Sequence, residues 1–307
     1  MPYPTQAQLL STGATTLTLT PSFPQPGREF KVRIDAYSYD MTRSRILWSI
    51  DGAVKSEYEG EREISLPAPA LGVPLSVAVS VTEPSGGVHT AKKTIVPSAL
   101  DVVVESDTRV PSFYKGRALP SPGSRVRLVA MPSLFSSNGT PAGAGNLLYT
   151  WRINKQVAKS GIGQRALATT MPNSGSLLVE VTAETTDGSA RHTSATEIAA
   201  TSPHNLFYED NPLYGLSHNA LPKDFTLLED EITVRAEPYF VSPDIFRNAR
   251  HEWTIGNAPV QNPNADPQTL TLRKTGETGS AEVGFSIRNL SSLLQAAAGT
   301  FTVHFEN

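Results

Sequence analysis

The chain has 307 residues, with 26 Lys+Arg against 29 Asp+Glu, and charged residues make up only 18% of it. This length leaves room for two or three domains that each bury a core of their own. A nearly balanced charge gives no indication of binding to nucleic acid or to an anionic membrane surface. The absence of cysteine excludes disulfides, thiol nucleophiles, thiolate metal sites and iron–sulfur clusters.

Segment 1–14 is polar and has no periodic pattern, so we expect a flexible arm. The sequence shows neither a signal peptide nor an apolar run of about 18 residues that could span a bilayer. The start, Met1-Pro2-Tyr3-Pro4, and the end directly after the strand-like run 300–305 suit an ectodomain whose signal peptide and anchor lie outside this chain. We therefore expect an extracellular or cell-surface location, with anchoring in the full-length protein.

Apolar and polar residues then alternate, and this period of two predicts half-buried strands. In 30–36, Phe, Val, Ile and Ala share one face, and the same phrase returns at 126–132 and 232–238. Each copy precedes a tryptophan strand in which Ile follows two residues after the tryptophan; the three residues are Trp48, Trp151 and Trp253. Their period of about 100 residues is the length of one immunoglobulin-like sandwich.

The sequence therefore predicts an all-β fold of three tandem immunoglobulin-like β-sandwiches, at 15–98, 99–202 and 203–307. The three tryptophans are predicted to form the structural core, because a tryptophan in the central strand touches both sheets. One short helix is expected in the last domain, within 289–299. There Leu290, Leu293 and Leu294 are spaced i, i+3, i+4, and Gly299 stands where a C-terminal cap belongs.

The predicted joints between domains are short and apolar, without a Gly/Ser-rich tether. Such joints should hold neighbouring domains within a limited range of angles. Aromatic side chains cluster near them, and we predict contact between domains or with a partner for Phe113, Tyr114, Phe207, Tyr208 and Tyr214.

The run from Leu17 to Phe305 resembles tandem immunoglobulin-like surface proteins of candidate-phyla (Patescibacteria) bacteria. The phrases that carry the resemblance are 111–120, 148–151 and 207–215. It implies the fold and a secreted or membrane-anchored location. It supplies no ligand and no catalytic residue to transfer.

No motif in the sequence indicates catalysis. The six histidines are scattered, and Ser112-Phe113-Tyr114-Lys115 matches Ser-x-x-Lys without a helical pattern after it. We expect no metal and no cofactor site, with calcium between domains as the alternative that the acidic residues leave open. The candidates are Glu105, Asp107, Glu209, Asp210, Asp224, Glu229, Asp230 and Glu231. No calcium-loop phrase accompanies them, which favours ordinary surface carboxylates.

We predict a non-catalytic rod that serves adhesion, spacing or surface assembly through contacts with a protein partner at the cell envelope. Nucleic acid is not expected as a partner, and a membrane would be reached only through segments absent from this chain. The alternative is a carbohydrate-binding accessory array, which would require exposed, coplanar aromatic rings on one domain. An enzyme would require a cleft that gathers carboxylates with perturbed pKa values.

Overall fold

The computed structural model describes residues 15–36, 39–262, 264–276, 278–289 and 292–305, and of residues 247–248 and 292–295 it describes the backbone alone. Within these ranges the chain is all-β, with twenty-three strands and three short 3-10 turns. No helix in these ranges is long and apolar enough to cross a membrane. Six sheets enclose three separate hydrophobic clusters, and we call each cluster with its two sheets a unit.

The N-terminal unit pairs the sheet β1-β2-β5 with the sheet β4-β3-β6-β7. In β2 the burial alternates strictly, because Phe30, Val32 and Ile34 point inward between charged neighbours. The strands are β1 (Thr16–Thr20), β2 (Glu29–Asp35), β3 (Arg45–Ile50), β4 (Ala53–Lys55), β5 (Glu63–Pro67), β6 (Leu75–Thr82) and β7 (Val88–Ile95), with a 3-10 turn at Ser56–Tyr58.

The central unit repeats this plan with the sheets β12-β9-β8 and β11-β10-β13-β14. Val126, Leu128 and Ala130 of β9 occupy the places that Phe30, Val32 and Ile34 hold in β2. The strands are β8 (Ala99–Ser106), β9 (Arg125–Ser133), β10 (Leu148–Ile153), β11 (Gln156–Ile162), β12 (Ala166–Thr170), β13 (Ser176–Glu184) and β14 (Arg191–Ala199), with a 3-10 turn at Ala144–Asn146.

The C-terminal unit is larger, with the sheets β16-β15-β18-β21 and β17-β23-β22-β19-β20. Its β17 pairs in parallel with β23, from Asp224↔Thr302 to Leu227↔Phe305, whereas the other named pairs are antiparallel. The strands are β15 (His204–Asn211), β16 (Gly215–Ala220), β17 (Asp224–Leu227), β18 (Glu231–Tyr239), β19 (Ala249–Ile255), β20 (Ala258–Val260), β21 (Thr269–Arg273), β22 (Gly279–Asn289) and β23 (Ser292–Phe305), with a 3-10 turn at Pro243–Asn248.

Each unit is built around one tryptophan of its central strand. Trp48 and Trp151 have no exposed surface, and Trp253 is 2% exposed. Each indole Nε1 donates to a backbone carbonyl 13 or 14 residues further on, at 2.8–3.0 Å from Glu61, Gln164 and Pro267 in turn. Burial of the ring and the satisfied N–H together fix the tryptophan in the same way three times.

The prediction of a helix within 289–299 is wrong. Asn289 is the last residue of β22, and from Ser292 onward the described part of that range belongs to β23, which pairs antiparallel with β22 at Ser292 and again from Ala296 to Phe305. Leu290 lies outside the described residues. Gly299 has a packing reason to be glycine, because a Cβ there would lie 2.6 Å from the carbonyl oxygen of Asn205. The Nδ2 of Asn205 also donates to carbonyls of β22 and β23, at 3.1 and 3.0 Å.

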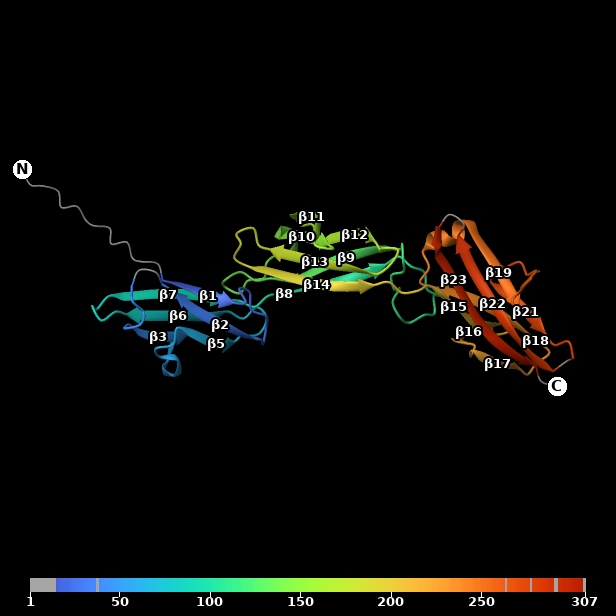
Figure 1. The fold of residues 1–307 in the computed structure, drawn as a ribbon, viewed down its shortest axis with the longest axis horizontal. Coiled ribbons are helices and arrows are strands. Elements are labelled where there is room, and N and C mark those ends of the chain that lie inside the picture. The colour runs from blue at the N-terminus through green and yellow to red at the C-terminus, as the bar shows by residue number, and fades with distance from the viewer. Residues whose placement is uncertain (1–14, 37–38, 263, 277, 290–291, 306–307) are drawn as a thin grey trace, which may run out of the picture.

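The three units follow one another along the long axis of the molecule, with the N-terminal unit at one end and the C-terminal unit at the other (Figure 1). Strand β8 begins at Ala99, directly after the first unit, and β15 begins at His204, directly after the second. Little chain therefore separates one unit from the next, and the joints are made by loops that pack across them.

Candidate functional site

The joint between the central and C-terminal units is closed by a pair of backbone hydrogen bonds. Arg109 N–H donates to the carbonyl of Val241 at 2.7 Å, and Phe240 N–H donates to the carbonyl of Arg109 at 2.8 Å. The two segments thus form an antiparallel bridge between units. Phe240 adopts φ +58°, a left-handed conformation that is costly for an aromatic residue and that the surrounding contacts must hold.

Side chains from both units form an aromatic cluster over this bridge, which we call the joint cluster. Tyr208, Tyr239 and Phe240 of the C-terminal unit are buried in it, and Val110, Phe113, Leu119 and Leu216 pack against them. Phe113 meets Tyr208 edge-on at 5.1 Å between ring centroids, and Tyr114 meets Tyr239 at 5.3 Å. Such edge-to-face pairs contribute about 0.5–1.5 kcal/mol each beyond their buried area.

The two buried tyrosines of the joint cluster share a hydrogen bond, with their hydroxyl oxygens 2.6 Å apart. Burial raises the pKa of the Tyr208 hydroxyl and that of the Tyr239 hydroxyl above their usual value. Both groups are therefore neutral hydrogen-bonding partners at neutral pH and bring no charge into the joint.

A charge network borders the joint cluster. Glu237, whose side chain is 5% exposed, lies 2.7 Å from Arg235 Nε and 3.5 Å from Arg109 Nη2. Arg235 also reaches Asp266 at 2.8 Å, and the Arg109 guanidinium lies 4.6 Å from the centroid of the Phe246 ring. Arg109 therefore joins the units three times, through its backbone, its ion pair and its stacking on an aromatic ring.

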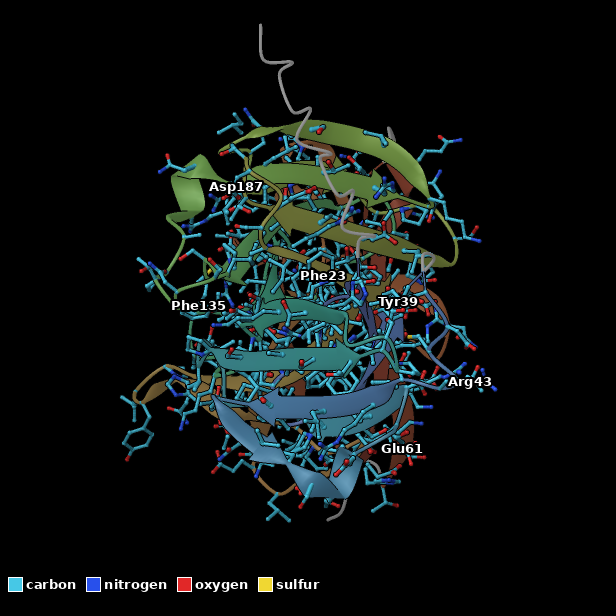
Figure 2. All side chains as sticks on the ribbon, turned by 90° about the vertical axis from the view of Figure 1, so that its left-hand side faces the viewer. Phe23, Tyr39, Arg43, Glu61, Phe135 and Asp187 are labelled. Atoms are coloured by element: carbon cyan, nitrogen blue, oxygen red, sulfur yellow. The ribbon has the colours of Figure 1, made fainter. Side chains whose placement is uncertain are left out.

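Phe135 lies at the joint between the N-terminal and central units. Its ring lies against Gly72, where an added Cβ would come within 2.7 Å of the ring. Gly139, at the tip of the same loop, approaches Gly72 O so closely that a Cβ would lie 3.0 Å from it. Figure 2, which views the molecule from the N-terminal side, labels Phe135 together with Phe23, which lines a small pocket of the same joint.

The five aromatic residues predicted for contact separate into three groups. Phe113, Tyr114 and Tyr208 belong to the joint between the central and C-terminal units. Phe207 instead points into the core of the C-terminal unit, 4.8 Å from Phe301 between ring centroids. Tyr214 is 89% exposed at the turn between β15 and β16. The rings of Tyr114 and Tyr239 are nearly perpendicular, at 88°, which is packing geometry rather than a flat platform for a sugar.

Several of the acidic residues considered for calcium form ion pairs or turn contacts. Glu105 pairs with Arg127 at 2.9 Å, Glu231 with Arg273 at 2.6 Å, and Asp107 accepts the backbone N–H of Arg125 at 3.1 Å. Among the described residues, no group of three or more His, Asp or Glu side chains could hold a metal ion.

Ser112 and Lys115, which match Ser-x-x-Lys, lie on an exposed turn rather than on a helix. The N–H of Tyr114 between them bonds the carbonyl of Pro111 at 3.0 Å. The Ser-Lys geometry of an acyltransferase needs a helix N-terminus to bring the two side chains together.

No protein-family model matches the chain, and no curated protein matches it. Among solved structures, the three N-terminal domains of the Highly Immunogenic Outer Capsid protein of bacteriophage RB49 share 13% identity, with 96% of this chain and 99% of that chain covered and a TM-score of 0.30. The central fibronectin-III array of RIM-binding protein shares 12% identity over 96% and 97%, with a TM-score of 0.34. A Bacteroides ovatus protein of the mixed-linkage glucan utilization locus, solved with a heptasaccharide, shares 14% over 92% and 64%, with a TM-score of 0.22. The first two are immunoglobulin- or fibronectin-like neighbours, and likeness at these scores carries no argument on function.

Proposed function

We propose that this chain is a non-catalytic rod of three immunoglobulin-like sandwiches. It stands outside the cell or on the envelope of a bacterium, anchored in its full-length form, and it spaces or assembles surface components through protein–protein contacts. The observation that carries the proposal is the backbone bridge between Arg109 and Val241. A tether would be free of such contacts, whereas a bridge beside a buried aromatic cluster holds two units at one angle.

The rod is tested by distances between spin labels, and the lack of native cysteine makes labelling specific. Ala158→Cys in the central unit and Ser280→Cys in the C-terminal unit are both exposed positions. The reference is a label pair within the C-terminal unit, Lys223→Cys with Ser280→Cys. We expect the distances across the joint to form a single distribution as narrow as that of this reference pair. A broad or multiple distribution across the joint, with a narrow one inside the unit, would contradict a fixed angle.

The joint cluster is tested in the same labelled chain. Phe113→Ala with Tyr114→Ala removes the aromatic contacts that the central unit contributes, without touching the core of the C-terminal unit. This double variant should broaden the distribution, whereas Val103→Ala, an exposed apolar control on β8, should not. The surface location is tested separately, because protease treatment of intact source cells should release fragments of this chain.

A further inference from the structure

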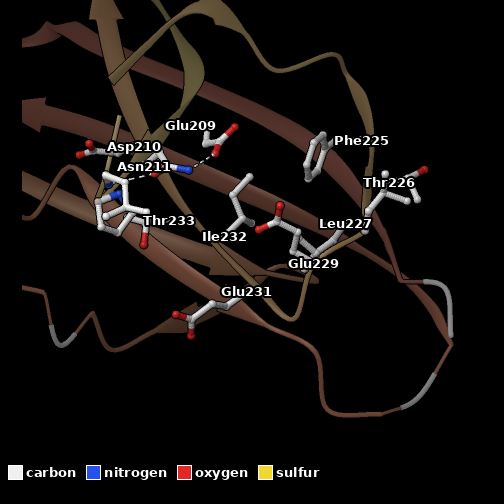
Figure 3. A pocket seen from close by; sticks show the side chains of 13 residues that line it. Glu209, Asp210, Asn211, Phe225, Thr226, Leu227, Glu229, Glu231, Ile232 and Thr233 are labelled. Carbon is white, nitrogen blue, oxygen red and sulfur yellow. Dashed lines mark hydrogen bonds between the residues drawn. The ribbon is translucent and has the colours of Figure 1, made fainter. Parts of the chain in front are cut away.

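The C-terminal unit holds a groove where two neighbouring strands diverge. The pairing of β15 with β18 runs as far as Glu209↔Val234, while β18 continues to pair with β21 as far as Glu231↔Arg273. Beyond that point β15 is no longer paired with β18 and keeps only its pairing with β16 on its other edge, while β17 pairs with β23 in the other sheet. The space left between residues 209–213, 225–229 and 231–233 has a volume of about 410 Å³, and we call it the C-terminal groove (Figure 3).

The C-terminal groove combines an apolar floor with a negatively charged rim. Phe225, Leu227 and Ile232 line it from the core side, and its thirteen lining residues include four carboxylates and no Lys or Arg. In the view of Figure 3, the side chain of Ile232 lies between those of Glu209 and Glu229. An aliphatic surface beneath a carboxylate is what the stem and the head of a Lys or Arg side chain require.

Two of these carboxylates already have cations, and two do not. Glu231 pairs with Arg273 at 2.6 Å, and Asp210 lies 4.0 Å from Arg235. Glu209 accepts a hydrogen bond from Asn211 Nδ2 at 3.1 Å, and Glu229 is exposed; neither has an ion pair among the described residues. The rim therefore keeps negative charge that an incoming cation can neutralise.

Large apolar side chains stand around the opening of the groove. Leu213 is 86% exposed, Leu228 is 79% exposed, and Tyr214 beside Leu213 is 89% exposed. Exposed apolar residues that gather at a concave site are typical of binding surfaces, and tyrosine is enriched among the residues that dominate binding energy. A second copy packed groove against groove is disfavoured as the occupant, because it would bring the same negative rim.

We propose that the C-terminal groove binds a peptide segment of a partner protein in which a Lys or Arg stands next to an aliphatic or aromatic residue. The cation meets Glu209 and Glu229, and the apolar neighbour packs on Leu213, Tyr214 and Leu228. This inference rests on the proposed function in one respect, since it names the chemistry of the protein partner that the rod would engage.

The test selects random dodecapeptides displayed on phage against the whole chain and sequences the bound pool. We expect enrichment of peptides that pair Lys or Arg with an aliphatic or aromatic neighbour. Affinity of the consensus peptide is then measured by fluorescence anisotropy. Glu209→Gln with Glu229→Gln should weaken it about tenfold, the combined effect of two partly exposed ion pairs. Tyr214→Ser should weaken it about fivefold or more.

Matched controls are Glu57→Gln with Glu61→Gln, which removes two exposed carboxylates from the N-terminal unit, and Val157→Ser, which removes an exposed apolar residue from the central unit. Both should leave the affinity unchanged. The proposal is overturned if no peptide is enriched, if the enriched peptides lack basic residues, or if the groove variants bind as well as the controls. Retention of the chain on a glycan array in place of peptides overturns it as well. Spin-label distances in the same variants separate this failure from failure of the rod, because they do not depend on the groove.

Discussion

Glu237 is the buried carboxylate of the joint, and we predict that removal of one of its cations destabilises the C-terminal unit more than removal of the whole ion pair. Arg235→Met keeps an aliphatic side chain but takes away the cation at 2.7 Å. Arg109, at 3.5 Å, then remains as the cation of Glu237 among the described residues. Loss of one partner from a buried pair costs about 3–5 kcal/mol, and because Arg109 stays within reach we expect about 3 kcal/mol.

The double variant Arg235→Met with Glu237→Leu leaves no buried charge behind. The former partners of the pair can be solvated, because the side chains of Asp266 and Arg109 are 41% and 34% exposed. Replacement of a buried ion pair by apolar residues of similar volume is often neutral, so we expect a loss below about 1 kcal/mol. The double variant should therefore be more stable than Arg235→Met alone by about 2 kcal/mol.

The assay is urea unfolding followed by the fluorescence of Trp253, in a chain in which Trp48 and Trp151 are replaced by Phe. Each unit contains one tryptophan, so this background reports on the C-terminal unit alone. The exposed pair Lys31–Glu63 is the control, and Lys31→Met, followed through Trp48, should leave the urea midpoint of the N-terminal unit unchanged. A double variant as unstable as Arg235→Met alone would refute the reasoning.

Three further predictions concern the other units. Trp151→Ala should destabilise the central unit by about 3–5 kcal/mol, measured by hydrogen exchange, and unchanged exchange would contradict a core role. Gly72→Ala should broaden spin-label distances between the N-terminal and central units, because its Cβ would meet the Phe135 ring at 2.7 Å; Gly27→Ala, at a similar φ with open space around it, is the control and should not broaden them. Burial lowers the pKa of His192 below 6.5, so the unfolded chain binds its proton more readily. Stability should then be full above about pH 6.5 and fall as the pH drops below it, a fall that His192→Gln should flatten in urea titrations; an NMR titration of His192 with a pKa above 6.5 would oppose this.

The alternation of apolar residues was sufficient to predict the strands but not the surfaces that cover them. Phe207 and Tyr208 are neighbours on β15 and therefore point to opposite faces. One ring enters the core and the other enters the joint cluster, and both are buried. The sequence shows two adjacent aromatic residues, and which of them meets the central unit depends on the distant segment around Phe113.

The helix expected near the end of the chain failed for a related reason. Leucines spaced three and four apart and a glycine after an alanine run favour a helix locally. In the folded chain β22 offers a long antiparallel partner, and tertiary pairing overrides the local preference. Gly299 is a glycine because the backbone of Asn205 lies too close for a side chain. The two residues are 94 positions apart in the sequence, so a local pattern could not predict this contact.

The sequence predicted the residues of the candidate site only in part. Of the joint cluster, Tyr208 stands close to the predicted boundary at 202–203. Phe113 and Tyr114 follow the other predicted boundary, at 98–99, and neither Tyr239 nor Phe240 was among the predicted residues. The C-terminal groove could not be predicted, since it arises where β15 and β18 stop pairing, and that divergence depends on the register of four strands.

The parallel pairing of β17 with β23 gives the C-terminal unit a response to tension. A pull between the start of β17 and the end of β23 draws the two strands along each other in opposite directions, so it loads their four residue pairs in shear. Bonds loaded in shear must break together, whereas the bonds of a strand peeled from its end break one at a time. A pull applied between these two points would therefore be shared across the whole edge of β17.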